Sequence, residues 1–191
     1  HSSLKENTTA TGNTAVGADA LESNTTGHSN VSVGFAALYN HTTGIDNVAI
    51  GRDALYTSTT ASYNVAIGYN AMKAAPDGAS QFSECVVIGS EAMETSDSAH
   101  SVVAIGYRAG KSTDTWYLCT AVGVSAGGNS NTTNYTQNCT YIGYAAGVDV
   151  EANDNTALGS SAMSYNVAAE LLYFNLKPLP ILCKFLILDL E

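Results

Sequence analysis

Apolar and polar positions alternate in one short stretch that recurs along the chain. In residues 47–55, Val48 and Ile50 alternate with Ala49 and Gly51, and a period of two is typical of a β-strand. Eight further copies follow the same pattern. Three are strict, 13–21, 30–38 and 64–72, and five are looser, 85–93, 102–110, 119–127, 139–147 and 155–163. A repeat of fixed period predicts a solenoid of stacked coils.

Each of the nine copies has Gly in its fifth place and Ala three residues later. Glycine adopts backbone angles that other residues avoid, so we expect each Gly to mark the same corner of a coil. Successive glycines are 17, 17, 17, 21, 17, 17, 20 and 16 residues apart: Gly17, Gly34, Gly51, Gly68, Gly89, Gly106, Gly123, Gly143 and Gly159. The sequence therefore predicts an all-β, parallel β-solenoid of about nine 17-residue coils.

Within a coil, Val48, Ile50 and Leu55 are predicted to supply the buried side chains, and Ala54-Leu55 is predicted to form a second strand face. Stacking should also place equivalent polar residues over one another. The first four copies begin with Asn, which predicts a ladder in which each side-chain amide bonds to the next: Asn13, Asn30, Asn47 and Asn64.

Three segments divide the chain. Residues 1–12 are polar and are predicted to form a leader or a partial first coil, and residues 13–164 form the solenoid. Copies six to eight end in Ala-Gly instead of Ala-Leu, which predicts a thinner core there, with Trp116 covering it or facing a partner. Residues 165–191 lack the repeat.

The last segment is strongly apolar over 171–191, so an exposed edge strand there is not expected. It is predicted to cap the solenoid, to join three chains, or to insert into a neighbouring molecule by strand addition. The candidate assembly residues are Leu182, Phe185, Ile187 and Leu188.

Charge excludes several partners. The chain has 17 acidic and 7 basic residues and a net charge of −10, which disfavours nucleic acid and anionic membrane surfaces. No apolar run reaches the roughly 20 residues that span a bilayer, so no membrane insertion is expected. The chain begins at His1, which we interpret as a processed product or a fragment.

The cysteines follow no zinc-binding pattern. Cys85, Cys119 and Cys139 occupy the slot that Asn fills elsewhere, and Cys119 and Cys139 belong to consecutive copies. Adjacent strands lie about 4.8 Å apart, so these two are candidates for a disulfide or for a stacked, reduced pair, with the reduced pair favoured.

Seven Asn-x-Ser/Thr sequons are candidate glycosylation sites, although Asn- and Thr-rich turns explain them more simply. They are Asn7, Asn24, Asn30, Asn40, Asn131, Asn134 and Asn138.

No catalytic, cofactor or metal site is predicted. His28, His41 and His100 have no acid or Ser at a constant offset, and the slot of Asp19 and Asp53 is not acidic in the other copies. Ser125 fits Gly-x-Ser-x-Gly but lies in the repeat slot, so we interpret the match as coincidental.

The Asn-x-Ala-Ile/Val-Gly-x-x-Ala pattern over residues 13–163 resembles the head repeat of trimeric autotransporter adhesins (the YadA-like head) and related tail-fibre repeats of phages and viruses. The resemblance implies a left-handed β-roll, three chains about one axis, and an extracellular, cell-surface or virion location. The repeat here is longer than in that family, and residues 167–191 match nothing in it.

The residues point to trimerisation independently, because Ala49 and its equivalents form a column of small side chains that would let another chain approach. Solvent exposure of that column is the alternative. The equivalents are Ala15, Ser32, Ala66, Ala104, Ala121 and Ala157.

The leading functional hypothesis is a non-enzymatic extracellular fibre or adhesin that binds a cell-surface or glycan ligand through loops and tyrosine columns. Tyr69, Tyr107 and Tyr144 share one slot, and Tyr39 and Tyr56 share another. Stacking between coils explains these tyrosines equally well. The alternative function is a filament subunit that polymerises head to tail through 171–191, and ice binding is a weaker third idea.

Overall fold

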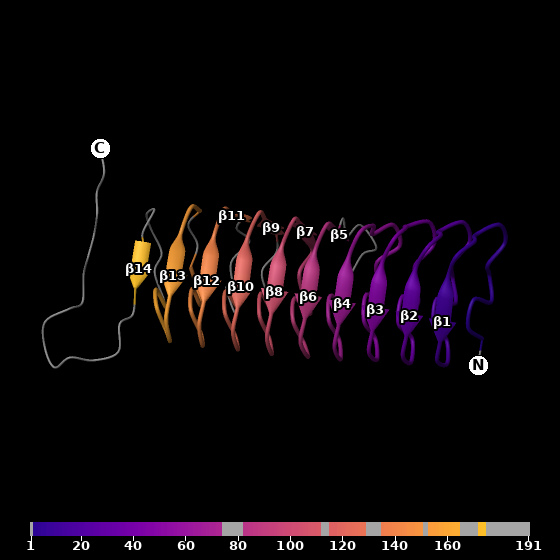
Figure 1. Ribbon diagram of the computed structural model, residues 1–191, viewed down its shortest axis with the longest axis horizontal. Coiled ribbons are helices and arrows are strands. Elements are labelled where there is room, and N and C mark those ends of the chain that lie inside the picture. The colour runs from indigo at the N-terminus through magenta and orange to yellow at the C-terminus, as the bar shows by residue number, and fades with distance from the viewer. Residues whose placement is uncertain are drawn as a thin grey trace, which may run out of the picture.

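The computed structural model describes residues 2–73, 82–111, 115–128, 135–150, 153–164 and 172–174. Its main feature is one ten-stranded parallel sheet in which neighbouring strands come from successive copies of the repeat. The strands lie in a row, with β1 and β14 at its opposite ends (Figure 1). In sheet order they are β1 (Thr14–Val16), β2 (Val31–Val33), β3 (Val48–Ile50), β4 (Val65–Ile67), β6 (Val86–Ile88), β8 (Val103–Ile105), β10 (Thr120–Val122), β12 (Thr140–Ile142), β13 (Thr156–Leu158) and β14 (Leu172–Phe174).

A second parallel sheet of four strands accompanies the later coils. Its order is β11 (Tyr135–Gln137), β9 (Thr115–Tyr117), β7 (Ser98–His100) and β5 (Phe82–Ser83). The described residues contain no helix, and accordingly none that could cross a membrane. The predicted all-β, parallel β-solenoid is confirmed, whereas its left-handedness and its trimeric state stay predictions.

Equivalent residues of successive coils lie directly over one another. Ala49 pairs with Ser32 on one side and Ala66 on the other, and the Gly51 amide donates to the Val33 carbonyl at 2.8 Å. Gly51 has a φ of 129°, and a Cβ there would lie 2.5 Å from the Gly68 carbonyl oxygen. Glycine is therefore required at this corner both by the backbone angle and by the close approach of the next coil.

The inside and outside of the main sheet are the reverse of the expectation. Ala49 is fully buried, whereas Ile50 is 37% exposed and Val48 is partly exposed. The coil is too narrow for three large side chains, so the inward strand position takes Ala and the centre is filled by Leu55, which is fully buried. The column of small residues is consequently interior and is neither a subunit interface nor a solvent-facing surface.

The segment Ala54-Leu55 is a turn and not the second strand face that we expected. Asp53 and Leu55 have φ values of 57° and 50°, in the left-handed region that L-residues seldom occupy. These angles fold the chain back under the strand and point Leu55 into the coil. No sequence pattern marks a leucine with a positive φ, so the sequence alone could not distinguish this turn from a strand.

The later coils keep a filled core despite losing Leu. Trp116 from β9 and Tyr141 from β12 are almost completely buried, and their rings meet edge to face at a centroid distance of 6.3 Å. Trp116 therefore lies inside the solenoid, and the expected thinning of the core is wrong. The later coils differ from the first four by the second sheet.

The ends of the chain continue the stack. Leu4 and Glu6 donate backbone hydrogen bonds to Ala20 and Glu22 in the first full coil, which gives residues 2–12 the form of a partial coil. At the other end, β14 adds to β13 as the tenth strand. The candidate assembly residues Leu182, Phe185, Ile187 and Leu188 lie outside the described residues.

Candidate functional site

The outward side of the main sheet, here called the outer face, carries two columns of β-branched or apolar side chains. Each of the nine repeat strands contributes its first and third residue. The first column contains Thr14, Val31, Val48, Val65, Val86, Val103, Thr120, Thr140 and Thr156, and the second contains Val16, Val33, Ile50, Ile67, Ile88, Ile105, Val122, Ile142 and Leu158.

No member of either column is charged, and the only polar groups are four threonine hydroxyls at the ends of the first column. The second column is the more exposed. Five of its side chains are exposed, from 37% at Ile50 and Ile105 to 57% at Val16, and the other four, Val33, Ile67, Ile88 and Val122, are half-buried. Nine strands at about 4.8 Å spacing make this face about 40 Å long. The face of a sheet that contacts water normally carries polar residues. The apolar side chains of the outer face are therefore unfavourable in contact with water.

A second surface feature runs along the turns that follow the glycines, and we call it the aromatic edge. The residue after Gly is aromatic in every second coil, and all four rings are well exposed: Phe35 (50%), Tyr69 (45%), Tyr107 (41%) and Tyr144 (62%). The intervening coils carry Arg52, Ser90 and Val124 at this position. The Arg52 guanidinium lies 5.6 Å from the Phe35 ring centroid and 5.9 Å from that of Tyr69.

Tyr39 and Tyr56 behave differently from the aromatic edge. They occupy adjacent coils, and their rings stack face to face at 5.2 Å with an angle of 6°. For this pair, the structure shows the coil-to-coil stacking that was one of the two interpretations of the tyrosine columns.

Two hollows lie beside the aromatic edge. One, of about 440 Å³, is lined by Phe35, Tyr39, Tyr56 and the side chains of Asp19, Arg52, Asp53 and Lys73. The other, of about 350 Å³, includes Tyr144, Ser125, Arg108 and Lys111. The second hollow adjoins an ionic cluster in which Glu91 accepts hydrogen bonds from Lys111 at 2.7 Å and Arg108 at 2.8 Å, and these bonds lower the pKa of the Glu91 carboxyl.

The Asn side chains form the predicted ladder inside the first coils. Asn47 Nδ2 donates to Asn30 Oδ1 at 2.9 Å, and Asn64 Nδ2 donates to Asn47 Oδ1 at 3.0 Å. At the first step the Asn30 backbone amide, not its side chain, bonds to Asn13 Oδ1. The Asn64 side chain closes the ladder by accepting from the Cys85 amide at 3.1 Å.

The cysteines continue the same column as free, buried thiols. The Cys139 amide donates to Cys119 Sγ at 3.4 Å, so the structure holds the reduced pair and not the disulfide. Burial raises the pKa of the Cys85 thiol to about 11, and a hydrogen bond to Cys139 together with burial raises that of Cys119. The protonated Cys85 and Cys119 thiols are poor nucleophiles and poor metal ligands, whereas the hydrogen bond with the Cys119 side chain lowers the pKa of the Cys139 thiol.

The sequons divide by exposure. Asn24 and Asn30 are fully buried, and Asn24 Nδ2 donates to the Gly27 carbonyl at 2.9 Å, so neither can carry a glycan in this fold. Asn7 and Asn138 are exposed and Asn40 is partly exposed. The candidate sites Asn131 and Asn134 lie outside the described residues.

The histidines do not come together. His41 is buried and its Nδ1 lies 3.2 Å from the Ser58 carbonyl, whereas His28 is exposed on another turn. His100 contacts Ser83 Oγ and stacks on Tyr117 at 5.1 Å. Within the described ranges, no three His, Cys, Asp or Glu side chains are grouped so as to hold a metal ion.

Comparison with models of known protein families, with curated proteins and with solved structures found no match to this chain. The outer face and the aromatic edge are therefore interpreted from their own chemistry. Sequence reasoning identified the tyrosines of the edge but missed Phe35, whose place in the same slot was visible in the repeat alignment.

Proposed function

We propose that the chain is a non-enzymatic, extracellular fibre or adhesin segment in which three copies pack through the outer face about one axis. The observation that carries the proposal is that every repeat strand adds at least one apolar side chain to this face and none adds a charge along about 40 Å of parallel sheet. Apolar surface of this extent on a flat sheet is an association site unless something covers it.

The shape of the outer face favours three copies. It is only two columns wide, and in a threefold arrangement each column can face a different neighbour. Val, Ile and Thr side chains on in-register coils form regular ridges, which allows the columns of identical chains to interdigitate along their whole length. The resemblance of the repeat to trimeric adhesin heads supports the same arrangement.

The mass of the native assembly tests this proposal. We expect the full chain, 19.8 kDa, to sediment as a trimer and the double variant Ile50→Lys/Ile105→Lys to sediment as a monomer, because lysine cannot be buried unpaired between coils. The double variant Ile50→Thr/Ile105→Thr keeps β-branching and should weaken the trimer less. Leu118→Lys is the matched control, since Leu118 is 57% exposed but lies outside the outer face. A monomeric wild-type chain would refute the proposal.

A second candidate, the head-to-tail filament, is favoured by the open ends of the sheet. Among the described strands, β1 and β14 each pair on one side only, with β2 and β13. Unpaired parallel edges at opposite ends of the molecule can accept a strand from a neighbour. Electron microscopy distinguishes the two, since short rods of uniform length favour the adhesin segment and long unbranched fibres favour the filament.

A further inference from the structure

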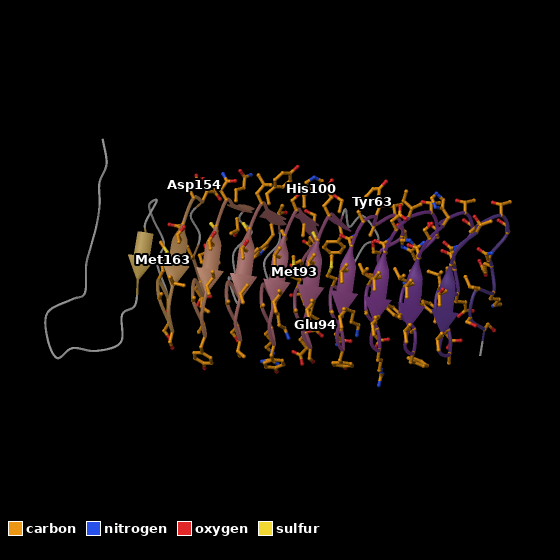
Figure 2. All side chains as sticks on the ribbon, in the orientation of Figure 1. Tyr63, Met93, Glu94, His100, Asp154 and Met163 are labelled. Atoms are coloured by element: carbon orange, nitrogen blue, oxygen red, sulfur yellow. The ribbon has the colours of Figure 1, made fainter. Side chains whose placement is uncertain are left out.

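The aromatic edge presents rings at a constant interval. Phe35, Tyr69, Tyr107 and Tyr144 follow the glycines of every second coil, and those glycines lie in one in-register column. Two coils at about 4.8 Å each separate neighbouring rings by about 10 Å along the solenoid axis. Glu94, which accepts a hydrogen bond from the Asn70 side chain next to Tyr69, is labelled in Figure 2 on the edge opposite the one that carries Tyr63.

That interval restricts the ligand. In an extended β-1,4-linked polysaccharide, alternate sugar rings present the same face, and the disaccharide repeat has the length of two coils. An exposed aromatic ring stacks on the apolar C–H face of a pyranose, because the ring is large, flat and has an electron-rich face. Four rings in register can therefore contact every second sugar of one straight chain.

The polar groups beside the rings suit a neutral, hydroxyl-rich ligand. The hollow next to Phe35 contains two acids, Asp19 and Asp53, and two bases, Arg52 and Lys73, so it carries no net charge. Arg52 Nε donates to Asp53 Oδ2 at 3.2 Å. The Asp53 side chain is buried, but the guanidinium is exposed and keeps further donors for hydroxyl groups. A strongly anionic polymer finds no excess of positive charge here, and the chain as a whole carries −10.

We infer that the aromatic edge binds an extended, neutral β-1,4-linked polysaccharide lying parallel to the solenoid axis, with Phe35, Tyr69, Tyr107 and Tyr144 as stacking platforms. The inference deepens the adhesive part of the proposed function, on which it rests, by naming the class of ligand. The turns that carry the rings are separate from the two columns of the outer face, so trimerisation and polysaccharide binding use different side chains.

Two hexasaccharides of glucose test the spacing. Titration of the full chain with cellohexaose, which is extended, should give measurable binding, whereas maltohexaose, which has the same composition but a coiled α-1,4-linked backbone, should bind at least about tenfold more weakly. The same comparison can be made with insoluble polymers, and the chain should be retained more strongly on cellulose or chitin than on starch granules. Equal binding of the two hexasaccharides, or no binding to either, would overturn the inference.

Single-ring variants locate the site. Tyr69→Ala and Tyr107→Ala remove the two middle rings, and each should lower the affinity for cellohexaose about three- to tenfold, the loss expected for one aromatic stacking contact. Tyr63→Ala is the control, because Tyr63 is 55% exposed on the opposite edge and its removal should change nothing. Wild-type affinity in both edge variants would contradict the assignment.

The native mass is measured on the same samples, so that the two proposals fail separately. A trimer that does not bind cellohexaose overturns only the polysaccharide inference, and a monomer that binds it overturns only the trimer. A change of mass in Tyr69→Ala would show that the aromatic edge contributes to self-association, which would also overturn the polysaccharide inference.

Discussion

The first four coils and the sixth to eighth coils fill the same cross-section with different side chains. In the first group, one large aliphatic residue per coil points inward from the turn: Leu21, Leu38, Leu55 and Met72, all fully buried. In the second group, glycine occupies this place at Gly110, Gly127 and Gly147, and Trp116 and Tyr141 fill the centre from the strands.

The exchange is reciprocal in space. A Cβ on Gly127 would meet the Trp116 ring, and a Cβ on Gly147 would meet the Tyr141 ring. The turn loses its side chain where the strand gains a large one, so the volume inside each coil stays filled. Protein interiors tolerate such exchanges as long as packing density is kept.

The features common to both groups define the fold. The glycine corner, the buried Ala that follows it and the in-register main sheet continue from β1 to β13. The identity of the large core residue and the presence of the second sheet vary. The glycine corner, the buried Ala and the main sheet therefore specify the solenoid, whereas the large core residues can be exchanged. Three experiments test this distinction.

The largest effect is expected at the Trp116–Gly127 pair. Trp116→Ala should cost about 3–5 kcal/mol of unfolding free energy because it leaves a large cavity, and Gly127→Leu should cost about 1–3 kcal/mol because it overfills the coil. The double variant recreates the core of the first coils, in which a leucine in the turn fills the centre. The backbone at Gly127 allows this, because its φ of 59° is close to the 50° of Leu55 at the equivalent position. Urea denaturation of the double variant should show a loss smaller than the sum by at least about 1 kcal/mol.

Gly128→Leu is the control for that cycle. A Cβ on Gly128 would lie near the carbonyl oxygens of Arg108 and Ser125 and not near Trp116, so it should not rescue Trp116→Ala. Additive costs for Trp116→Ala and Gly127→Leu would show that the two residues do not share one space, and the reciprocal exchange would then be wrong.

Much of this architecture could be predicted from the sequence, because the repeat itself contains it. The period, the glycine column, the Asn ladder and the parallel in-register stacking all follow from equal residues at equal intervals. What could not be predicted was the direction in which the strand faces. Ala49 and Ile50 alternate in either orientation, and the usual rule that the larger residue is buried fails in a coil that holds a single large side chain.

The candidate surfaces depended on that direction. With Val48 and Ile50 assigned to the interior, the Ala column became the candidate interface on the repeat strands, and the outer face was overlooked. A signal that could have corrected this is the pairing of residue types within a coil: the first three coils, which bury Leu in the turn, have only Ala or Ser in the middle of the strand. The positive φ of Asp53 and Leu55, which sets this turn, has no such signal in the sequence.

The polar column gives the second experiment, of intermediate size. Asn47 donates to the Ala61 carbonyl at 2.7 Å and accepts from both the backbone amide and the side chain of Asn64, at 3.1 and 3.0 Å. Asn47→Ala leaves buried donors and an acceptor unpaired and should cost about 2–3 kcal/mol.

Cys119→Ala is the comparison from the second group of coils. Cys119 Sγ donates to the Tyr117 carbonyl at 3.0 Å and accepts from the Cys139 amide, but sulfur forms weak hydrogen bonds, so its loss should cost about 1 kcal/mol. Both losses of unfolding free energy are to be measured by urea denaturation at pH 7 under reducing conditions. Equal costs would mean that the column contributes by packing alone and that the Asn ladder adds no stability of its own.

The smallest effect should distinguish the two groups of coils by their response to pH. His41 occupies the buried position that Asn24 fills one coil earlier, and burial lowers its pKa below the usual 6.5, outweighing the hydrogen bonds from the imidazole to the backbone at Ser58 and Gly44. The folded coil therefore holds neutral imidazole while the unfolded chain takes up a proton, so stability is present above pH 6.5 and is lost as the pH falls below it. Between pH 7 and pH 6 the loss should be at most about 0.7 kcal/mol, the value for an imidazole that stays neutral throughout in the folded coil. His41→Asn, which copies the neighbouring coil, should remove this difference, whereas His28→Asn, at an exposed turn, should keep it. A pH response that survives His41→Asn would assign the titrating group elsewhere, and the first coils would then be no more sensitive to acid than the coils built around Trp116 and Tyr141.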